Sequence, residues 1–307
     1  MKTNRFYLIA ALLGVVFTAC TKEQAFDRPE DAPEAATWKL KVEMSKDIAT
    51  KAMNIDGEGK LKTSLAEGEK VNVFLGGEYL GTLTAADNGS KIVLSGNITK
   101  ADGLQAGSAL NLLFPGRNDH SWTYIGQDGS APSASGTMAT LFDYAKATLS
   151  VTSLDDVNHE IVTDATEQFA SQQSVYRLGF KVGGAGDAIA VKSFSVASNR
   201  NKLVRTREYS GSDWVSAYGS ITVEPKADPA GNLYHMALRN ENSTEEDTYT
   251  FMVVGKADDA LYEGTKVISN TSYLENGKYL GMSGISISKK DFAPEASGTI
   301  SSESGVL

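Results

Sequence analysis

Apolar and polar side chains begin to alternate strictly at residue 37. Over the eight residues 37–44 every second side chain is apolar, namely Trp38, Leu40, Val42 and Met44. Successive side chains of a β-strand point to opposite faces of its sheet, so this period of two is typical of a strand with one buried face. The sequence therefore predicts a half-buried strand over 37–44.

Short runs of the same character recur between turn signals rich in Gly, Asn, Asp and Pro. Val71–Leu75 and Tyr79–Leu83, on either side of Gly76-Gly77, predict a β-hairpin. Further runs lie at 91–94, 110–114, 147–152, 175–182, 189–197, 214–223, 234–238, 248–254, 278–282 and 285–288. No stretch of twelve or more residues has a clear 3.6-residue apolar period, and the β-branched residues of 154–169 disfavour a long helix.

The pattern therefore predicts an all-β fold. Domains commonly contain about 100–200 residues, so a chain of 307 residues accommodates two β-sandwiches. We expect the first sandwich over 37–165 and the second over 166–307.

The N-terminal residues have the features of an export signal. Lys2 and Arg5 precede the apolar run Phe6–Phe17, which is shorter than the roughly 20 residues that cross a bilayer and is typical of a signal peptide. Phe17-Thr18-Ala19-Cys20 is similar to the lipobox of bacterial lipoproteins, and Cys20 is the chain's single cysteine. We therefore expect a signal peptide over 1–19 and acyl chains, palmitate among them, on Cys20, where each buried CH₂ adds about 0.8 kcal/mol of membrane affinity.

Two features bear on where the exported chain resides. Residues 20–36 are polar, acidic and contain two prolines, which favours a flexible tether. The residues after Cys20 are Thr21 and Lys22 rather than a retention Asp, which favours the outer membrane or cell surface. The alternative is a signal peptide cut at its small residues, with Cys20 incidental.

Charge and composition exclude several classes of function. With 29 basic and 38 acidic residues the formal charge is −9, and no Lys/Arg cluster offers a footprint for nucleic acid. One cysteine forms no internal disulfide and no cysteine-based zinc site. His120, His159 and His235 are far apart in sequence, so neither a histidine metal site nor any cofactor is predicted.

Motifs that resemble catalytic or ligand loops fail at a required position. Asn54–Gly59 has the oxygen spacing of a calcium loop, but the twelfth position is Leu65 instead of Glu. Gly183–Gly186 precedes a predicted strand, whereas a phosphate-cradling turn precedes a helix. No Gly-x-Ser-x-Gly elbow occurs, and carboxylates adjacent in sequence make poor acid/base pairs. The sequence predicts no enzyme, although a glycosidase built from distant carboxylates stays open.

Two tryptophans differ in their expected roles. Trp38 lies on the apolar face of its strand and is predicted to pack in a core. Trp122 lies in the polar stretch 120–124 and is the candidate for stacking on a sugar ring.

Several short motifs follow the lipobox in a recognisable order. They are 47–52 (DIATKA), 65–74 (LAEGEKVNVF), 112–115 (LLFP), 142–147 (FDYAKA) and 174–180 (SVYRLGF). In this order the chain resembles the fimbrillin family of Bacteroidetes-type lipoprotein pilins, the subunits of type V pili. The resemblance implies two transthyretin-like Greek-key β-sandwich domains and a non-enzymatic structural or adhesive subunit of surface fimbriae.

The resemblance also implies a route of assembly. In the family the lipid delivers the precursor to the outer membrane, and a trypsin-like protease removes an N-terminal segment with the first strand. A strand from a neighbouring fimbrial subunit then fills the groove. Here the detachable strand would be 37–44, and cleavage would follow Lys46 or Lys51, because no Arg lies between Arg28 and Arg117.

Some alternatives stay open at this point. The subunit could keep its lipid and strand as an anchor, or belong to the shaft or the tip. Its C-terminal segment 284–307 could be donated to a neighbour or kept. The alternative function is a surface glycan-binding lipoprotein with Trp122 and tyrosines as stacking platforms, and host or bacterial surface glycans or proteins are the expected ligands.

Overall fold

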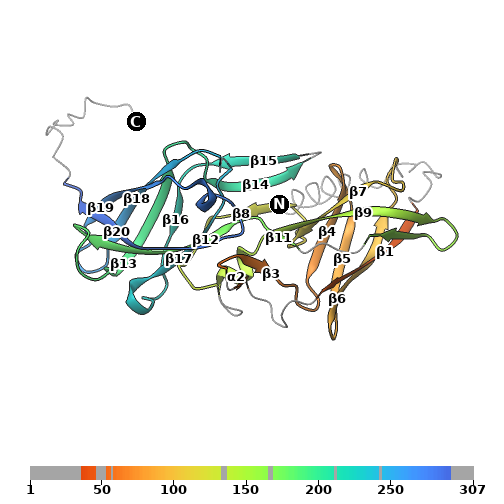
Figure 1. Cartoon of the computed structure of the whole chain (residues 1–307), viewed down its shortest axis with the longest axis horizontal. Coiled ribbons are helices and arrows are strands. Elements are labelled where there is room, and N and C mark those ends of the chain that lie inside the picture. The colour runs from red at the N-terminus through yellow and green to blue at the C-terminus, as the bar shows by residue number, and fades with distance from the viewer. Residues whose placement is uncertain are drawn as a thin grey trace, which may run out of the picture. The chain divides into compact units, whose positions relative to one another are not determined.

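The computed structural model describes residues 36–45, 53–56, 58–132, 137–164, 169–210, 213–241 and 244–291. The predicted signal peptide, Cys20, the tether up to residue 35, and the two candidate processing sites Lys46 and Lys51 lie outside these residues. The chain from Thr37 onward forms one compact unit. The predicted all-β fold is confirmed, since most described residues lie in strands (Figure 1).

The first sheet contains the N-terminal strands. They are β1 (Thr37–Ser45), β2 (Met53–Ile55), β3 (Leu61–Thr63), β4 (Lys70–Leu75), β5 (Glu78–Asn88), β6 (Lys91–Thr99), β7 (Ala109–Phe114), β9 (Ala145–Asp155), β10 (Glu160–Thr163) and β11 (Ala170–Ser171). Their order is β10-β1-β6-β5-β4-β7-β9-β11-β3-β2. Because β10 also pairs with β9, the strands from β1 through β6, β5, β4, β7, β9 and β10 close into a hydrogen-bonded ring.

The interior of this ring is a hydrophobic core. It buries the alternate side chains of each strand, including Trp38, Leu40 and Val42 of β1 and Leu94 and Ile98 of β6. The predicted hairpin is confirmed as β4 and β5, which pair in antiparallel register. The alternation along the chain is therefore the pattern that fills the first core.

The second sheet contains the C-terminal strands. They are β12 (Ser174–Val182), β13 (Val191–Ser198), β16 (Ile221–Val223), β17 (Tyr234–Leu238), β18 (Asp247–Gly255), β19 (Leu261–Ile268) and β20 (Tyr279–Lys289). Their order is β16-β13-β18-β19-β20-β12-β17, and only the β12–β20 pairing is parallel. The runs predicted at 278–282 and 285–288 form one strand, because Ser283 and Gly284 continue β20.

A third, small sheet joins strands from distant parts of the chain. It has the order β15-β14-β8, formed by β15 (Asp213–Tyr218), β14 (Val204–Ser210) and β8 (Ser121–Thr123). The run predicted over 214–223 is therefore two strands, which separate at Gly219-Ser220 and enter different sheets. The described helices are short: α2 (Thr137–Leu141), η1 (Ala230–Asn232) and η2 (Thr271–Tyr273).

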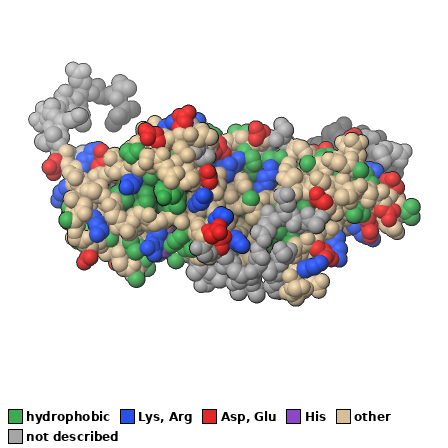
Figure 2. Space-filling view, viewed as in Figure 1, with side chains coloured by type: hydrophobic (Ala, Val, Ile, Leu, Met, Phe, Trp, Pro, Cys, Tyr) green, Lys and Arg blue, Asp and Glu red, His purple; other side chains and the backbone are tan. Residues whose placement is uncertain are grey.

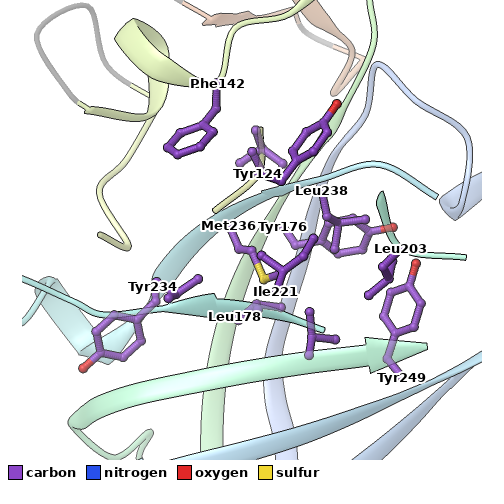
Figure 3. Close-up of a cluster of buried hydrophobic side chains, with 14 of the residues drawn as sticks. Tyr124, Phe142, Tyr176, Leu178, Leu203, Ile221, Tyr234, Met236, Leu238 and Tyr249 are labelled. Atoms are coloured by element: carbon purple, nitrogen blue, oxygen red, sulfur yellow. The ribbon is translucent and has the colours of Figure 1, made fainter. Parts of the chain in front are cut away.

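The second core is built from both halves of the chain. Tyr124 and Phe142, which precede the second sheet in sequence, belong to the same buried cluster as Tyr176, Met236 and Leu238 (Figure 3). The boundary predicted between residues 165 and 166 lies in a segment outside the described residues. The second core consequently depends on residues 122–144 as well as on the strands after residue 173.

Gln127 joins the two end strands of the second sheet. Its backbone forms a bridge with Val223 of β16, and its carbonyl accepts a hydrogen bond from the Glu224 amide at 2.9 Å. Its side-chain amide donates to the Ala237 carbonyl of β17 and accepts from the Ala237 amide, both at 2.7 Å. The Gln127 side chain is fully buried and pairs with Ala237 as the backbone of a neighbouring strand would.

Replacing Gln127 with Ala is expected to lower the free energy of unfolding by about 2–4 kcal/mol, because the Ala237 amide and carbonyl lose their partners in a buried site. Gln105→Ala is the matched control, since Gln105 is exposed and should change stability little. Urea denaturation of both variants followed by tyrosine and tryptophan fluorescence measures the difference. Equal stability of the two variants would show that the Gln127 bridge contributes nothing.

Candidate functional site

Strand β1 is held differently on its two edges. On one edge it pairs with β6 along its whole length, from Thr37↔Thr99 to Ser45↔Lys91. On the other edge it pairs with β10 only at Lys39↔Glu160 and Leu40↔Ile161. The N-terminal half of β1 is therefore an interior strand, and its half after Leu40 is an edge strand among the described residues.

The buried face of β1 carries most of its attachment to the core. Trp38, Leu40 and Val42 are 1–2% exposed, and Met44 is half-buried. Lys39, Lys41 and Glu43 point outward, as the alternation predicts. Full burial of such side chains contributes about 1.5–3 kcal/mol each, so the three buried ones dominate the hold on β1.

The turn between β9 and β10 clamps the N-terminal half of β1. The His159 carbonyl accepts a hydrogen bond from the Lys39 amide at 2.8 Å, and the His159 ring stacks on Trp38 with centroids 5.3 Å apart. The ammonium of Lys100 lies 4.3 Å from the Trp38 ring centroid. The Asp155 carboxylate fixes the turn by accepting from the amides of Val157 and Asn158 at 3.0 Å. We call residues 155–161 the β9–β10 clamp.

A shallow cavity of about 450 Å³ lies where the clamp ends. It is lined by residues 39–41 of β1, 95–97 of β6, and Glu160 and Ile161 of β10. Beyond it, the outward charges form the pairs Lys41–Glu43 and Glu43–Lys91, at 3.2 and 2.7 Å. These contacts, led by the hydrogen bond from Lys91, lower the pKa of Glu43. All three side chains are exposed, so the pairs hold β1 only weakly.

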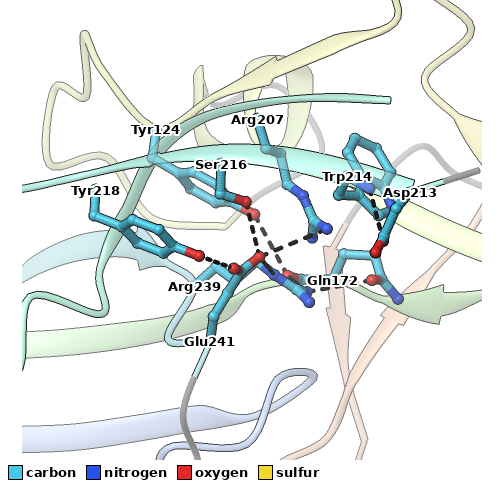
Figure 4. A network of polar contacts seen from close by, with 9 residues as sticks. All are labelled: Tyr124, Gln172, Arg207, Asp213, Trp214, Ser216, Tyr218, Arg239 and Glu241. Carbon is cyan, nitrogen blue, oxygen red and sulfur yellow. Dashed lines mark hydrogen bonds and ion pairs between the residues drawn. The ribbon is translucent and has the colours of Figure 1, made fainter. Parts of the chain in front are cut away.

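A second group of polar residues lies beside the third sheet. The Glu241 carboxylate accepts hydrogen bonds from Tyr218 at 2.5 Å and Ser216 at 3.0 Å, both on β15 (Figure 4). The same carboxylate lies 3.6 Å from the Arg207 guanidinium and 3.4 Å from that of Arg239. We call Arg207, Ser216, Tyr218, Arg239 and Glu241 the Glu241 cluster.

Burial and the neighbouring charges together shift the pKa values of Glu241 and Arg207. Burial raises the pKa of Glu241, but the hydrogen bonds from Tyr218 and Ser216 and the charges of Arg207 and Arg239 outweigh it, so the pKa is lowered overall. Burial, together with repulsion by Arg239, lowers the pKa of Arg207 to about 10. Each charge has an opposite partner within the cluster, which is the arrangement of a structural ion pair rather than of an acid/base couple.

The structure corrects the expectation for Trp122, which is 2% exposed. Residues 121–123 are not a loop but strand β8, which pairs with β14. The Trp122 ring stacks on Tyr144 at 5.0 Å and contacts Trp214 at 4.3 Å, and the Arg207 guanidinium lies 3.9 Å from the Trp214 ring centroid. The ring of Trp122 is therefore part of the second core and has no free face for a sugar.

The other candidate groups are separated in space. His120 packs against Phe74 and Tyr79, His159 against Trp38, and His235 against Tyr279. Within the described ranges no three His, Cys, Asp or Glu side chains are grouped to hold a metal ion. In the same ranges no helix has the length and hydrophobicity needed to cross a membrane. On the face shown in Figure 2, basic and acidic side chains are interspersed.

Comparisons with known proteins give matches in structure only. No protein-family model matches the chain, and no curated protein matches it significantly in sequence. A proposed cell adhesion protein from Bacteroides uniformis aligns at 12% identity and a TM-score of 0.37, over 85% of this chain and 98% of its own. A proposed cell adhesion protein from Bacteroides fragilis aligns at 7% identity and a TM-score of 0.36, over 84% of this chain and 99% of its own.

A pilin from a different group of bacteria also aligns. The shaft pilin SpaA from Lactobacillus rhamnosus GG matches at 12% identity and a TM-score of 0.30, over 84% of this chain and 100% of its own. At TM-scores this low, none of these likenesses carries an argument about function. The proposal below rests on the residues and contacts of this chain.

Proposed function

We propose that this chain is a non-enzymatic structural or adhesive subunit of a cell-surface fimbria. It is exported as a lipoprotein acylated at Cys20, held at the outer membrane, and assembled by proteolysis-triggered strand exchange. Its two halves are transthyretin-like Greek-key domains. The proposal rests on how β1 is held. Its buried side chains complete the first core, and its backbone forms a full ladder on only one edge.

Removal of β1 would create a site of defined chemistry. It would free the edge of β6 over Lys91–Thr99 and open the space now filled by Trp38, Leu40 and Val42. A free strand edge beside an apolar groove is a template for β-strand addition. A strand from another subunit with the same alternation would restore both the ladder and the core.

The partners follow from this mechanism. A trypsin-like protease would cut after Lys46 or Lys51, both of which follow the end of β1 at Ser45 in the sequence. Other fimbrial subunits, of the same or a different kind, would donate and accept strands. Host or bacterial surface proteins or glycans would be the targets of adhesion. The burial of Trp122 leaves the glycan-binding alternative with only tyrosines as stacking platforms.

Processing and assembly are tested together in cells. Mass spectrometry of the surface-assembled protein should find an N-terminus directly after Lys46 or Lys51, and unboiled gels should show SDS-resistant ladders. The double substitution Lys46→Gln and Lys51→Gln should abolish both, whereas Lys226→Gln, a change of the same type at an exposed lysine, should not. A full-length, acylated and purely monomeric species in wild-type cells would contradict the proposal.

Lipidation has its own readout. Replacing Cys20 with Ala should abolish incorporation of labelled palmitate and release the chain from the outer-membrane fraction, because its acyl chains would be absent. Labelling that persists in Cys20→Ala would place the lipid elsewhere or exclude it.

The β9–β10 clamp should control how readily β1 opens. His159→Asn is expected to weaken the hold on β1 by about 1 kcal/mol, and so to raise hydrogen exchange of peptide 37–45 by about fivefold, because the stack on Trp38 is lost. Asn tolerates the positive φ of 51° at this position. His120→Asn, at a φ of 50°, is a matched control. Equal exchange in both variants would show that the clamp does not hold β1.

A further inference from the structure

Strands β19 and β20 of the second sheet pair over only part of their length. They pair at Tyr262↔Lys289 and Glu263↔Ser288, and the Lys290 amide donates to the Leu261 carbonyl at 2.8 Å. The same register would next pair Thr265 with Ser286 and Val267 with Gly284, but those pairings are absent. At Gly264 the two strands still lie close together, because a side chain there would clash with the Ser286 carbonyl.

The two diverging strands leave a pair of facing edges. The far edge of β19 is occupied by β18 as far as Asp247↔Ile268, and the far edge of β20 is occupied by β12 from Val175↔Tyr279 onward. In an antiparallel strand, alternate residues direct their amide and carbonyl to the same neighbour. Since Leu261 faces β20, Thr265 and Val267 direct theirs toward the gap. On the β20 side the Tyr279 amide already donates to the Gly59 carbonyl at 2.7 Å, so this edge is open only beyond Tyr279. Among the described residues the gap is therefore bordered by Thr265 and Val267 of β19 and by β20 beyond Tyr279, with backbone groups of the kind that accept an added strand.

A groove of about 450 Å³ lies in this gap. It is lined by residues 266–270 and Tyr273, by Tyr176 of β12, and by residues 279–282. Val267 and Tyr273 are 53% and 49% exposed, and Leu280 and Met282 are partly buried. The wall along residues 279–282 corresponds to about 13 Å of extended chain, the length of about four residues.

The groove has one charged side chain in its lining, and it is positive. Lys266 is the only charged residue among those that line it, and no acidic side chain lies within ion-pair distance of Lys266 in the described part of the chain. A segment entering the groove would therefore meet apolar side chains, free backbone groups and one unmatched positive charge. A carboxylate next to an aliphatic side chain complements all three features.

We propose that the β19–β20 groove is a docking site for an extended segment of a partner protein that carries an aliphatic side chain next to Asp or Glu. The segment adds as a strand between β19 and β20, its backbone pairs with β19 at Thr265 and Val267 and with β20 beyond Tyr279, and its carboxylate pairs with Lys266. This site is separate from β1, because it lies in the second sheet and uses neither the first core nor the β9–β10 clamp.

The probe is a fluorescein-labelled peptide of sequence Thr-Val-Glu-Val-Thr, titrated with the full chain and followed by fluorescence anisotropy. We expect saturable binding, about tenfold weaker for Lys266→Glu. Lys181→Glu is the matched control, since it makes the same change of charge on β12 outside the groove and should bind as the wild type does. Hydrogen exchange should show new protection in peptides that cover 264–270 and 279–282.

Two further peptides distinguish strand addition from other modes of peptide binding. A peptide with N-methylated backbone amides should not bind, because it cannot complete the strand pairing, and a peptide with Lys in place of Glu should bind more weakly. Absence of binding, equal binding of the N-methylated peptide, or no effect of Lys266→Glu would each overturn the proposal. Displacement of the peptide by neutral oligosaccharides would also overturn it and assign the groove to a glycan. None of these results depends on cleavage after β1.

Discussion

A chain that begins at Lys46 is expected to lose about 5–9 kcal/mol of the free energy that stabilises its first core, because three side chains worth about 1.5–3 kcal/mol each leave it. These are Trp38, Leu40 and Val42, which β1 buries almost completely. Domains are commonly stable by only about 5–15 kcal/mol, so the loss should leave the first core marginal or unfolded. Urea denaturation with near-ultraviolet circular dichroism measures the change.

Rescue distinguishes an empty groove from general misfolding. A synthetic peptide of residues 37–45, added to the truncated chain, should restore the unfolding midpoint and protect residues 91–99 from hydrogen exchange, since β6 is its ladder partner. The control peptide carries Trp38→Ser, Leu40→Ser and Val42→Ser, which keeps the backbone groups and removes the apolar face. Rescue by both peptides, or by neither, would show that this apolar face does not determine strand binding.

The second large effect is expected at Glu241. Glu241→Gln should lower the free energy of unfolding by about 3–5 kcal/mol, because it leaves the guanidinium groups of Arg207 and Arg239 close together without a counter-charge. The side chain of Arg207 is 4% exposed, so solvent cannot replace the lost carboxylate. Glu208→Gln is the control, since Glu208 is exposed on the same strand as Arg207. A loss below about 1 kcal/mol, the range of exposed pairs, would contradict this account.

The pH dependence of stability follows from the same carboxylate. The pKa of Glu241 is lowered in the folded chain from its ordinary value of 4.5. Its contribution is therefore present above about pH 4.5 and is lost as the pH falls through the lower, folded value. Wild-type stability should fall more steeply below about pH 4.5 than that of Glu241→Gln, as thermal unfolding at a series of pH values would show. Parallel curves would assign the acid sensitivity to other groups.

The double variant Glu241→Gln with Arg207→Met tests the origin of the loss. Removing the buried charge together with its partner should recover part of the stability, because the unpaired guanidinium is the main cost. No recovery would show that the packing of Arg207 over Trp214, rather than its charge, is what the cluster supplies.

The Glu241 cluster and Gln127 lie where the two halves of the chain meet. The Tyr209 hydroxyl of β14 donates to the Gly76 carbonyl of the β4–β5 turn at 2.5 Å, and β8 pairs with β14. The Arg239 guanidinium donates to the Gln172 carbonyl between β11 and β12 at 2.8 Å. These contacts join the sheets by polar bonds as well as by the shared second core.

Strands with clean alternation were predictable, and strands without it were not. The sequence predicts β1, β4 and β5 because one face of each is apolar. It does not predict β14, whose residues 204–210 (VRTREYS) alternate poorly, or β19, where Gly264 interrupts the run. In β14 the buried members include Arg207, which is stable there only because Glu241 and Trp214 surround it.

The features of the candidate site were likewise predictable only in part. The sequence by itself determined which side chains of β1 face a core, since a period of two is a local property of the backbone. Only the tertiary structure decided that β10 clamps one half of β1, that Gln127 joins β16 to β17, and that Trp122 is buried. Each of these depends on partners that are about 85 to 120 residues away along the chain. Local pattern reports how a strand faces a core, whereas the choice of neighbour depends on distant contacts that no window of sequence contains.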